Sequence, residues 1–339
     1  MLLLITGGTL LMRGKKVLEP NKAAARDLVA EVPALGRMAR IDTRILFLMD
    51  SGDFQPENWV AIAREVHAAL SSGKYAGIVV VHGTDTMAYT ASALALLLGP
   101  VAHPVILTGS QRPLAELRTD ARENLITATL AATMPVPEVG IAFASRILRG
   151  ARSIKRDAWA LEAFDSPNCP PLVTMGVGVD VGGHVRAHAG ARKLSRFDPR
   201  IESRVLAVRV FPGLDPELLK GALRVGVRGL VLEAYGTGNL PHRGASLIPV
   251  LEEARERKVP VLVVSQCPRG TVDIGRYAGG ADALAAGAIS GGDMTVECAL
   301  AKLMIGLGRY GAGERLARYL ATDVVGEITS LGRRARASA

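Results

Sequence analysis

Four short polar loops follow apolar stretches in the amino-terminal half of the chain, and their residue types could do chemistry. Each offers a hydroxyl or carboxylate beside a glycine, where the backbone can turn tightly. The loops are Thr6-Gly7-Gly8-Thr9, Asp50-Ser51-Gly52, His82-Gly83-Thr84-Asp85-Thr86 and Thr108-Gly109-Ser110-Gln111. Ligands of open α/β sheets bind beyond the carboxyl ends of the strands. We therefore predict one shared polar site for a small molecule. For any single loop, capping of the following helix is an equally good interpretation.

Thr9 and Thr84 carry the hydroxyls best placed for a chemical role. A threonine is a weak nucleophile until a base takes its proton, and a desolvated lysine can be that base. Lys155 follows another predicted strand and could reach the same loops, and Asp85 adds a carboxylate beside Thr84. Composition favours a different interpretation of Lys155, a solvated surface lysine. The residues by themselves leave both open.

Other site chemistries lack their residue patterns. Gly7-Gly8 is not followed by the third glycine of a dinucleotide fingerprint, and the motifs G-x-x-x-x-G-K-[ST] and G-x-S-x-G are missing from the sequence. The six histidines are not spaced as metal ligands, and the three cysteines are far apart. We therefore expect no metal and no cofactor.

The elements that must position these residues alternate between short apolar runs and longer helix-like stretches. The predicted strands are Leu2–Ile5, Arg44–Leu48, Gly77–Val81, Val105–Thr108, Val139–Ala144, Val205–Val210, Gly229–Glu233 and Val261–Val264. The predicted helices are Glu57–Leu70, Thr86–Leu98, Thr119–Ala132, Pro216–Leu223, Gly244–Arg257 and Thr295–Gly306. Such alternation predicts mainly parallel sheets with helices on both faces, an α/β fold.

The alternation stops between residues 181 and 204, where glycine, histidine and arginine replace the apolar period. We therefore predict two domains, each an open, mainly parallel sheet flanked by helices. The predicted boundaries are an amino-terminal catalytic domain over 1–180, a linker over 181–204, a carboxyl-terminal domain over 205–332 and a basic tail over 333–339.

Composition restricts partners and compartment. The 339 residues carry a net charge of +9, but aromatic residues make up only 4%, so base-stacking surfaces are not expected and we predict no nucleic-acid partner. No apolar run approaches the roughly 20 residues of a membrane span, and the first residues lack the pattern of a signal peptide. Three scattered cysteines argue against a disulfide framework. We expect a cytoplasmic protein without a membrane association.

A series of longer motifs makes the sequence recognisable. In order, they are TGGT (6–9), HGTDTMAYTASAL (82–94), LTGSQRPLAELRTDARENL (107–125), RGARSIK (149–155), FDSPNCPPL (164–172), YGTGNLP (235–241), SQCPRGTVDIGRYAGG (265–280) and ISGGDMTVECALAKL (289–303). Together they resemble the bacterial-type L-asparaginase family, and more closely its cytosolic type I branch, from Leu2 to about Leu331. The resemblance implies an amidohydrolase that converts L-asparagine to L-aspartate and ammonia.

The resemblance also implies roles for particular residues. Thr9 would attack the side-chain amide carbon and form a β-aspartyl ester, which water then hydrolyses. Thr84, Asp85 and Lys155 would form a second proton-relay set, with Asp85 also contacting the substrate's α-ammonium group. The remaining substrate-binding positions would be Asp50, Ser51, Gly83 and Asn239.

In this family, the counterpart of Asn239 comes from a neighbouring subunit. The resemblance therefore implies a homodimer or homotetramer, in which the carboxyl-terminal domain contributes to the interface and to a neighbouring active site.

The sequence departs from the family pattern in the segment after Thr9. The family has a tyrosine on this mobile loop, whereas here the corresponding position is Leu18 and the first tyrosine of the chain is Tyr75. Either another group, such as Lys15 or Lys16, takes part, or turnover is slow. Cys267 falls where the type I branch has a cysteine at a second, regulatory asparagine site.

Two alternatives to an asparaginase stay open. One is a non-catalytic or slow amino-acid-binding or sensing homologue, which the missing tyrosine favours and the retention of Lys155 disfavours. The other is the amidase subunit of a tRNA-dependent amidotransferase. That subunit usually has an added amino-terminal domain, for which we expect no room in the four residues before Ile5.

Overall fold

The structure, a computed structural model, describes residues 1–13, 19–20, 22–186 and 194–329. Its contacts divide the chain into two compact units, Met1–Pro199 and Arg200–Ala339. The division falls within the segment expected to be a linker, but the beginning of that segment is packed. Val185 lies against a core of the first unit, and the backbone N–H of Arg186 donates to Glu138 Oε1 at 2.9 Å. Residues 182–186 are therefore part of the first unit.

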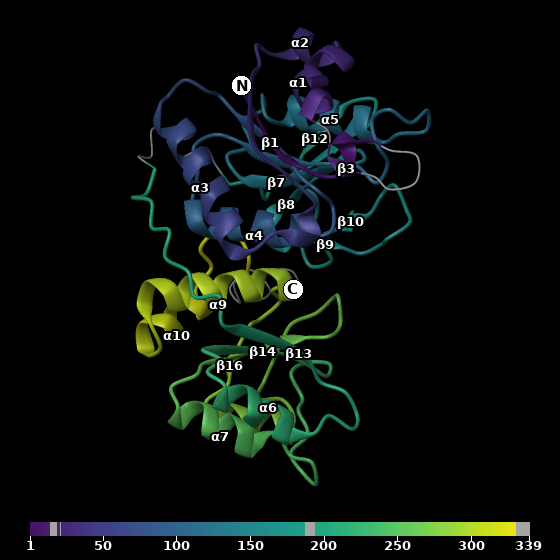
Figure 1. The fold of residues 1–339 in the computed structure, drawn as a ribbon. Helices are drawn as coiled ribbons and strands as arrows, with labels where there is room; N and C mark the ends of the chain where they lie inside the picture. The colour runs from purple at the N-terminus through teal and green to yellow at the C-terminus, as the bar shows by residue number, and fades with distance from the viewer. Residues whose placement is uncertain (14–18, 21, 187–193, 330–339) are drawn as a thin grey trace. The chain divides into compact units, whose positions relative to one another are not determined.

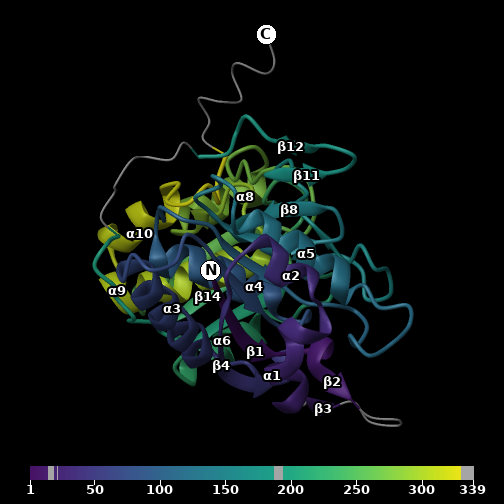
Figure 2. The ribbon, with the colours of Figure 1, turned by 90° about the horizontal axis from the view of Figure 1, so that it is seen from above.

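The first unit is built on a large mixed sheet. Its strands, in spatial order, are β12 (Val179–Val181), β11 (Val173–Met175), β8 (Arg146–Arg149), β7 (Val139–Phe143), β6 (Val105–Thr108), β5 (Ile78–Val81), β1 (Leu2–Gly7) and β4 (Asp42–Met49). The five from β7 to β4 are parallel, and β8, β11 and β12 continue the sheet antiparallel. Figure 2 shows β8, β11 and β12 following one another towards that edge.

Helices cover both faces of this sheet (Figure 1). On one face lie α1 (Lys22–Glu31), α2 (Ala34–Met38) and α5 (Ala121–Ala131), and on the other α3 (Pro56–Ser71) and α4 (Met87–Leu98). Leu3 and Ile5 belong to the core under α1, α2 and α5, and the alternate residues Leu2 and Leu4 are buried too. Burial on both faces explains why these strands are apolar without interruption.

The strand order reverses at β1. The chain passes from β1 to β4 on one side and then crosses to β5 on the other. Such a switch point leaves a crevice at the carboxyl ends of the two central strands, which is where open α/β sheets bind ligands. Thr9 follows the end of β1 by two residues, and Thr84 follows the end of β5 by three.

Short elements complete the first unit. They are the 3₁₀ turns η1 (Thr9–Leu11), η2 (Ser51–Asp53) and η3 (Gly150–Arg152), and the two-stranded pairs β2 (Met12–Arg13) with β3 (Glu19–Pro20) and β9 (Ile154–Lys155) with β10 (Phe164–Asp165).

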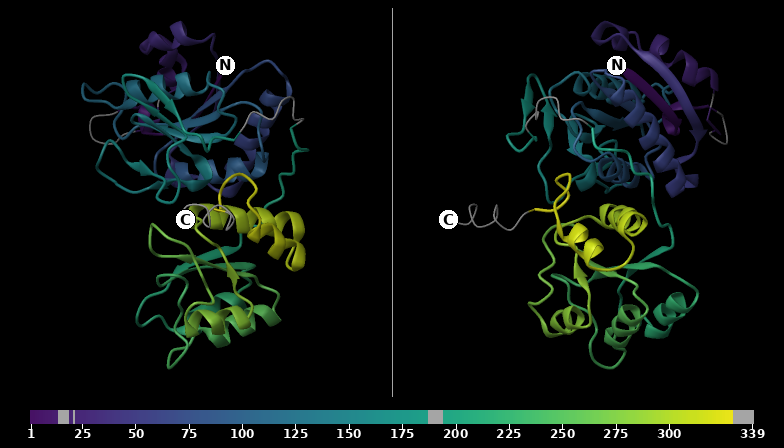
Figure 3. Two further views of the ribbon diagram at one scale, coloured as in Figure 1. Left: turned by 180° about the vertical axis from the view of Figure 1, so that it is seen from behind. Right: turned by 90° about the vertical axis from the view of Figure 1, so that its left-hand side faces the viewer.

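The second unit has a parallel sheet with helices on both faces, as Figure 3 shows. Its strands, in spatial order, are β13 (Val205–Arg209), β14 (Gly229–Ala234), β15 (Val261–Ser265) and β16 (Ile289–Ser290). One face carries α6 (Pro216–Arg224), α7 (Ile248–Glu256) and α8 (Ala278–Ala285), and the other α9 (Val296–Tyr310) and α10 (Glu314–Ala321).

The predicted α/β fold in two units is confirmed, and each predicted strand and helix has a counterpart within a few residues. Helix α7 begins four residues later than predicted, at Ile248 instead of Gly244. Helices α1, α2, α8 and α10 were not predicted from the sequence, nor were the short strands β2, β3, β8 to β12 and β16. Most of these strands have only two or three residues, which give too few alternations to detect, and α8 begins Ala-Gly-Gly, residues with opposing helix propensities.

Candidate active site

Two glycines bring the loop after β1 against its neighbours. Both have positive φ, +116° at Gly7 and +95° at Gly8. A Cβ on Gly7 would lie 2.1 Å from the backbone oxygen of Met49, and one on Gly8 would lie 2.5 Å from the backbone nitrogen of Gly83. No side chain fits at either position, so the close approach requires glycine. As a result, Thr9 begins directly beside the loop that carries Thr84.

The other loops meet in the same way. A Cβ on Gly83 would lie 2.5 Å from Ser51 Oγ, and one on Gly109 would lie 2.3 Å from the backbone oxygen of His82. The four polar loops singled out in the sequence are therefore packed closely against one another at the carboxyl edge of the first sheet.

The threonines of this cluster do not cap helices. Gly8, not Thr9, occupies the N-cap position of η1. Thr86 precedes α4, but its hydroxyl donates to the backbone oxygen of Ser51 at 2.8 Å. Asp50 does act as a cap, because its carboxylate accepts from the N–H of Gly52 at 2.9 Å. The capping interpretation therefore holds for Asp50 and fails for Thr9.

Lys155 reaches the loop after β5. Its Nζ donates to Thr84 Oγ1 at 2.8 Å and to Asp85 Oδ1 at 2.6 Å. The lysine side chain is only 19% exposed, while that of Asp85 is 67% exposed. Strand β9 holds Lys155 opposite Phe164, which is buried against Phe143. The solvated-lysine interpretation is therefore wrong, and the structure brings together Thr84, Asp85 and Lys155.

Gln111 is a further hydrogen-bond partner of Thr84, a role that was not predicted from the sequence. Thr84 Oγ1 donates to Gln111 Oε1 at 3.2 Å, while the amide nitrogen of Gln111 donates to the carbonyls of Ala158 and Ala160, both at 3.3 Å. The Thr84 oxygen thus accepts from Lys155 and directs its own proton to Gln111. Gln111 belongs to the polar loop predicted after β6. Its role as the acceptor for Thr84 depends on the carbonyls of Ala158 and Ala160, in the turn after Lys155.

His82 links the loop that carries Thr84 to helix α4. Its ring is fully buried, with Nδ1 2.7 Å from the carbonyl oxygen of Gly83 and Nε2 2.9 Å from Thr90 Oγ1. Burial lowers the pKa of His82 to about 4, although the hydrogen bond to Gly83 acts in the opposite direction. The imidazole is therefore neutral near pH 7, with Nδ1–H donating to Gly83 and Nε2 accepting from Thr90.

The remaining substrate-binding candidates lie in different parts of the chain. Ser51 is buried and Asp50 is exposed, both at the loop cluster. Asn239 belongs to the second unit, in the turn between β14 and α7, with its Oδ1 against the backbone of Gly279. Cys267 lies exposed after β15 as a free thiol. Lys15, Lys16 and Leu18 lie outside the described residues.

Other site types find no support in the part of the chain that the structure describes. No group of three or more histidine, cysteine or acidic side chains within it is arranged to hold a metal ion. Among those same residues, no helix is both long enough and apolar enough to cross a bilayer.

Comparisons with known proteins identify the family of this chain. The family model "Asparaginase, N-terminal" matches residues 1–187, and "Glutaminase/Asparaginase C-terminal domain" matches residues 204–320. The solved structure of the thermostable L-asparaginase from Thermococcus kodakarensis is 38% identical and covers 97% of this chain and 99% of its own, with a TM-score of 0.89.

Two further relatives differ in name. L-asparaginase 1 of Escherichia coli K12 is 38% identical over 329 residues, 96% of each chain. A glutamyl-tRNA(Gln) amidotransferase component from Pyrococcus abyssi is 35% identical over 316 residues, 90% of this chain and 70% of that protein. With both family models matched and such identity over nearly its whole length, this chain belongs to the asparaginase family.

Proposed function

We propose that this protein is an L-asparaginase, which hydrolyses the side-chain amide of L-asparagine to L-aspartate and ammonia. Relatives that are 38% identical to it carry that name. The observation that carries the proposal is the contact of Lys155 Nζ with both Thr84 Oγ1 and Asp85 Oδ1, beside the loop of Thr9. A binding protein would not need a partly buried lysine on a threonine hydroxyl.

The reaction proceeds in two steps. The hydroxyl oxygen of Thr9 bonds to the amide carbon, the carbon–nitrogen bond breaks, and the threonine proton is passed on to the departing ammonia. Backbone N–H groups near Thr9 and Thr84 stabilise the developing oxyanion. A water then attacks the aspartyl ester, and Thr84, whose oxygen is held by Lys155, relays a proton from that water to the departing oxygen of Thr9. The bond to Thr9 breaks and aspartate leaves.

Substrate binding uses the charges at the rim of the cluster. Asp85 is two-thirds exposed, so its second oxygen can pair with the α-ammonium of asparagine. Asp50 and Ser51 bind the α-amino and α-carboxylate groups, and Gly83 contributes its backbone. This division leaves the side-chain amide to face the two threonines.

One experiment locates the nucleophile. The variant Thr84→Val should form the aspartyl ester and then hydrolyse it slowly, so that mass spectrometry after rapid quenching finds one aspartyl group on the peptide that contains Thr9. Thr9→Val should show no ester at all. An ester found on the Thr84 peptide of the Thr9→Val variant would contradict the assigned roles.

The amidotransferase alternative is supported by the similarity to the Pyrococcus abyssi relative. The named asparaginases match a larger share of this chain, 96–97% against 90%. Purified protein should release ammonia from free asparagine without any tRNA or partner. Release from neither asparagine nor glutamine, together with asparagine binding by calorimetry, would instead support the sensing alternative.

We further propose a cytoplasmic homo-oligomer in which Asn239 serves the active site of a neighbouring subunit. Mixing Thr9→Ala and Asn239→Ala chains under conditions of subunit exchange tests this. If Asn239 acts across the interface, a mixed dimer regains one intact site, so about a quarter of all sites recover. If Asn239 acts within its own chain, or not at all, mixing restores nothing beyond the activity of the separate variants.

A further inference from the structure

The second unit contains a cavity at the amino-terminal edge of its sheet, the edge away from the loops of Asn239 and Cys267. It has a volume of about 510 Å³, within the range of small-molecule sites. The end of α7, the start of β15, the turn before β16 and the turn between α9 and α10 surround it. Every lining residue belongs to the second unit, so the cavity is formed by one compact body.

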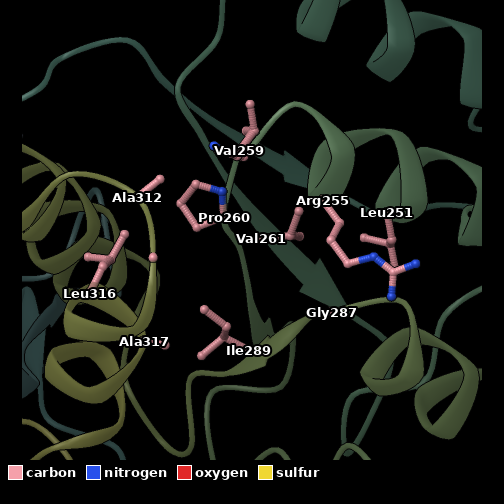
Figure 4. A pocket seen from close by; sticks show the side chains of 12 residues that line it. Leu251, Arg255, Val259, Pro260, Val261, Gly287, Ile289, Ala312, Leu316 and Ala317 are labelled. Carbon is pink, nitrogen blue, oxygen red and sulfur yellow. The ribbon is translucent and has the colours of Figure 1, made fainter.

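Its walls are apolar. Val261, Leu316 and Leu251 are almost completely buried, and Pro260 and Ile289 complete the lining between them. Figure 4 shows Pro260, Ile289 and Leu316 gathered around the hollow, with the side chain of Arg255 running between Val261 and Gly287. A hollow with such walls holds water poorly and favours an apolar occupant.

Two cations, Arg255 and Lys258, are the charged side chains of the lining, and no acidic side chain belongs to it. Arg255 lies against Gly287, where a Cβ would be 3.2 Å from Arg255 Cδ. Its Nη1 donates to the carbonyl of Ala285 at 3.2 Å, its one hydrogen bond within the described chain. The rest of the guanidinium fork stays available to an anion.

Lys258 occupies a position where glycine is usual. It follows α7 with a φ of +57°, its N–H donates to the carbonyl of Arg255, and the next N–H, that of Val259, donates to the carbonyl of Ala254. This is the left-handed helix end at which a side chain is disfavoured. Lys258 nevertheless adds a second cationic residue to the lining of the cavity, and such backbone outliers concentrate at functional positions.

From this combination of walls and charges, we propose that the cavity binds a small carboxylate with an apolar tail. The carboxylate pairs with Arg255 and Lys258, and the tail lies against Val261, Ile289 and Leu316. The site is independent of the proposed asparaginase chemistry, which uses residues of other loops.

Calorimetric titration of octanoate into the full-length protein tests the proposal. We expect saturable binding of one octanoate per chain, much weaker binding of octanol, which lacks the charge, and no binding of octylamine. The double variant Arg255→Gln with Lys258→Gln should bind octanoate at least about tenfold more weakly. Both are surface substitutions, and circular dichroism should show an unchanged fold.

The matched control is Arg257→Gln, which removes an arginine of the same helix end that pairs with Glu253 and does not line the cavity. Its octanoate affinity should equal that of the wild type. In a third variant, Ala317→Phe, an added ring occupies the cavity and octanoate binding should disappear. No saturable binding to the wild type, equal binding by the double variant, or equal binding of octylamine would each overturn the proposal.

Discussion

Two lysine–carboxylate pairs with the same 2.6 Å separation have opposite surroundings. Lys155 and Asp85 lie in the first unit with side chains 19% and 67% exposed, whereas Lys302 and Glu327 of the second unit are both completely buried. Lys302 also donates to the carbonyls of Leu320 and Thr322. Its three donors are therefore all used within the protein.

The carboxylates differ as well. Glu327 accepts from the N–H groups of Val324 and Val325 in addition to Lys302. Burial alone would raise the pKa of Glu327, but the charge of Lys302 and these donors hold it below its usual value. Asp85 has no comparable set among the described residues. The buried pair, with its hydrogen bonds satisfied within the protein, fastens residues 324–327 to α9, whereas the pair of Lys155 leaves its carboxylate exposed to solvent beside a threonine hydroxyl.

We expect the largest effect from substitution of Lys155, and we expect it on activity. Lys155→Met removes the group that holds the Thr84 oxygen, which the proposed mechanism uses for proton transfer, so ammonia release from asparagine should fall by about 10²–10⁴-fold. The midpoint of urea unfolding should change little, because the partner carboxylate stays hydrated. Lys74→Met is the control, since Lys74 pairs with an exposed Asp42 at the same distance. Near-normal turnover of Lys155→Met would contradict the role of the lysine.

At Lys302 the effect should fall on stability. Lys302→Met leaves Glu327 buried without its cation, which should lower the free energy of unfolding by about 3–5 kcal/mol. Turnover per folded molecule should stay at the wild-type level. Adding Glu327→Leu to this variant should recover most of the loss, because an apolar pair needs no desolvated charge. A Lys302→Met protein as stable as the wild type would show that the buried pair is not structural.

His82 extends the comparison to pH. Its folded pKa of about 4 lies below the ordinary histidine value of 6.5, so the unfolded chain binds a proton in this range that the folded chain does not. The resulting stability is present above pH 6.5 and is lost as the pH falls towards 4. Between pH 7 and 5 the free energy of unfolding should drop by about 2 kcal/mol through this group.

The control is His82→Gln, whose amide can still donate to the carbonyl of Gly83. It should be less stable at pH 7 but show a flatter pH dependence in urea unfolding at pH 7, 6 and 5. If the free energy of unfolding falls equally in the wild type and in His82→Gln between pH 7 and 5, the buried imidazole does not cause the loss of stability.

The two units also differ in which of their functional and structural residues could be predicted from the sequence. The strand ends at Thr9 and Thr84 were predictable, because apolar runs mark the buried strands and glycines mark the turns. The buried pair of Lys302 and Glu327 was not, since lysine and glutamate are ordinarily expected in solvent and the residues are 25 positions apart. The role of Gln111 was hidden for a related reason: its partners come from a turn that the chain forms only after Lys155.

Gln111 should give the smallest effect. Gln111→Leu removes the acceptor that holds the Thr84 proton, while Lys155 still contacts the hydroxyl oxygen. One neutral hydrogen bond contributes about 1 kcal/mol, so kcat for asparagine should fall about fivefold. The KM should hardly change, because Gln111 positions the hydroxyl rather than the substrate. Steady-state kinetics of ammonia release decides this. An effect confined to KM would place Gln111 against the substrate, and an unchanged kcat would mean that Lys155 alone orients Thr84.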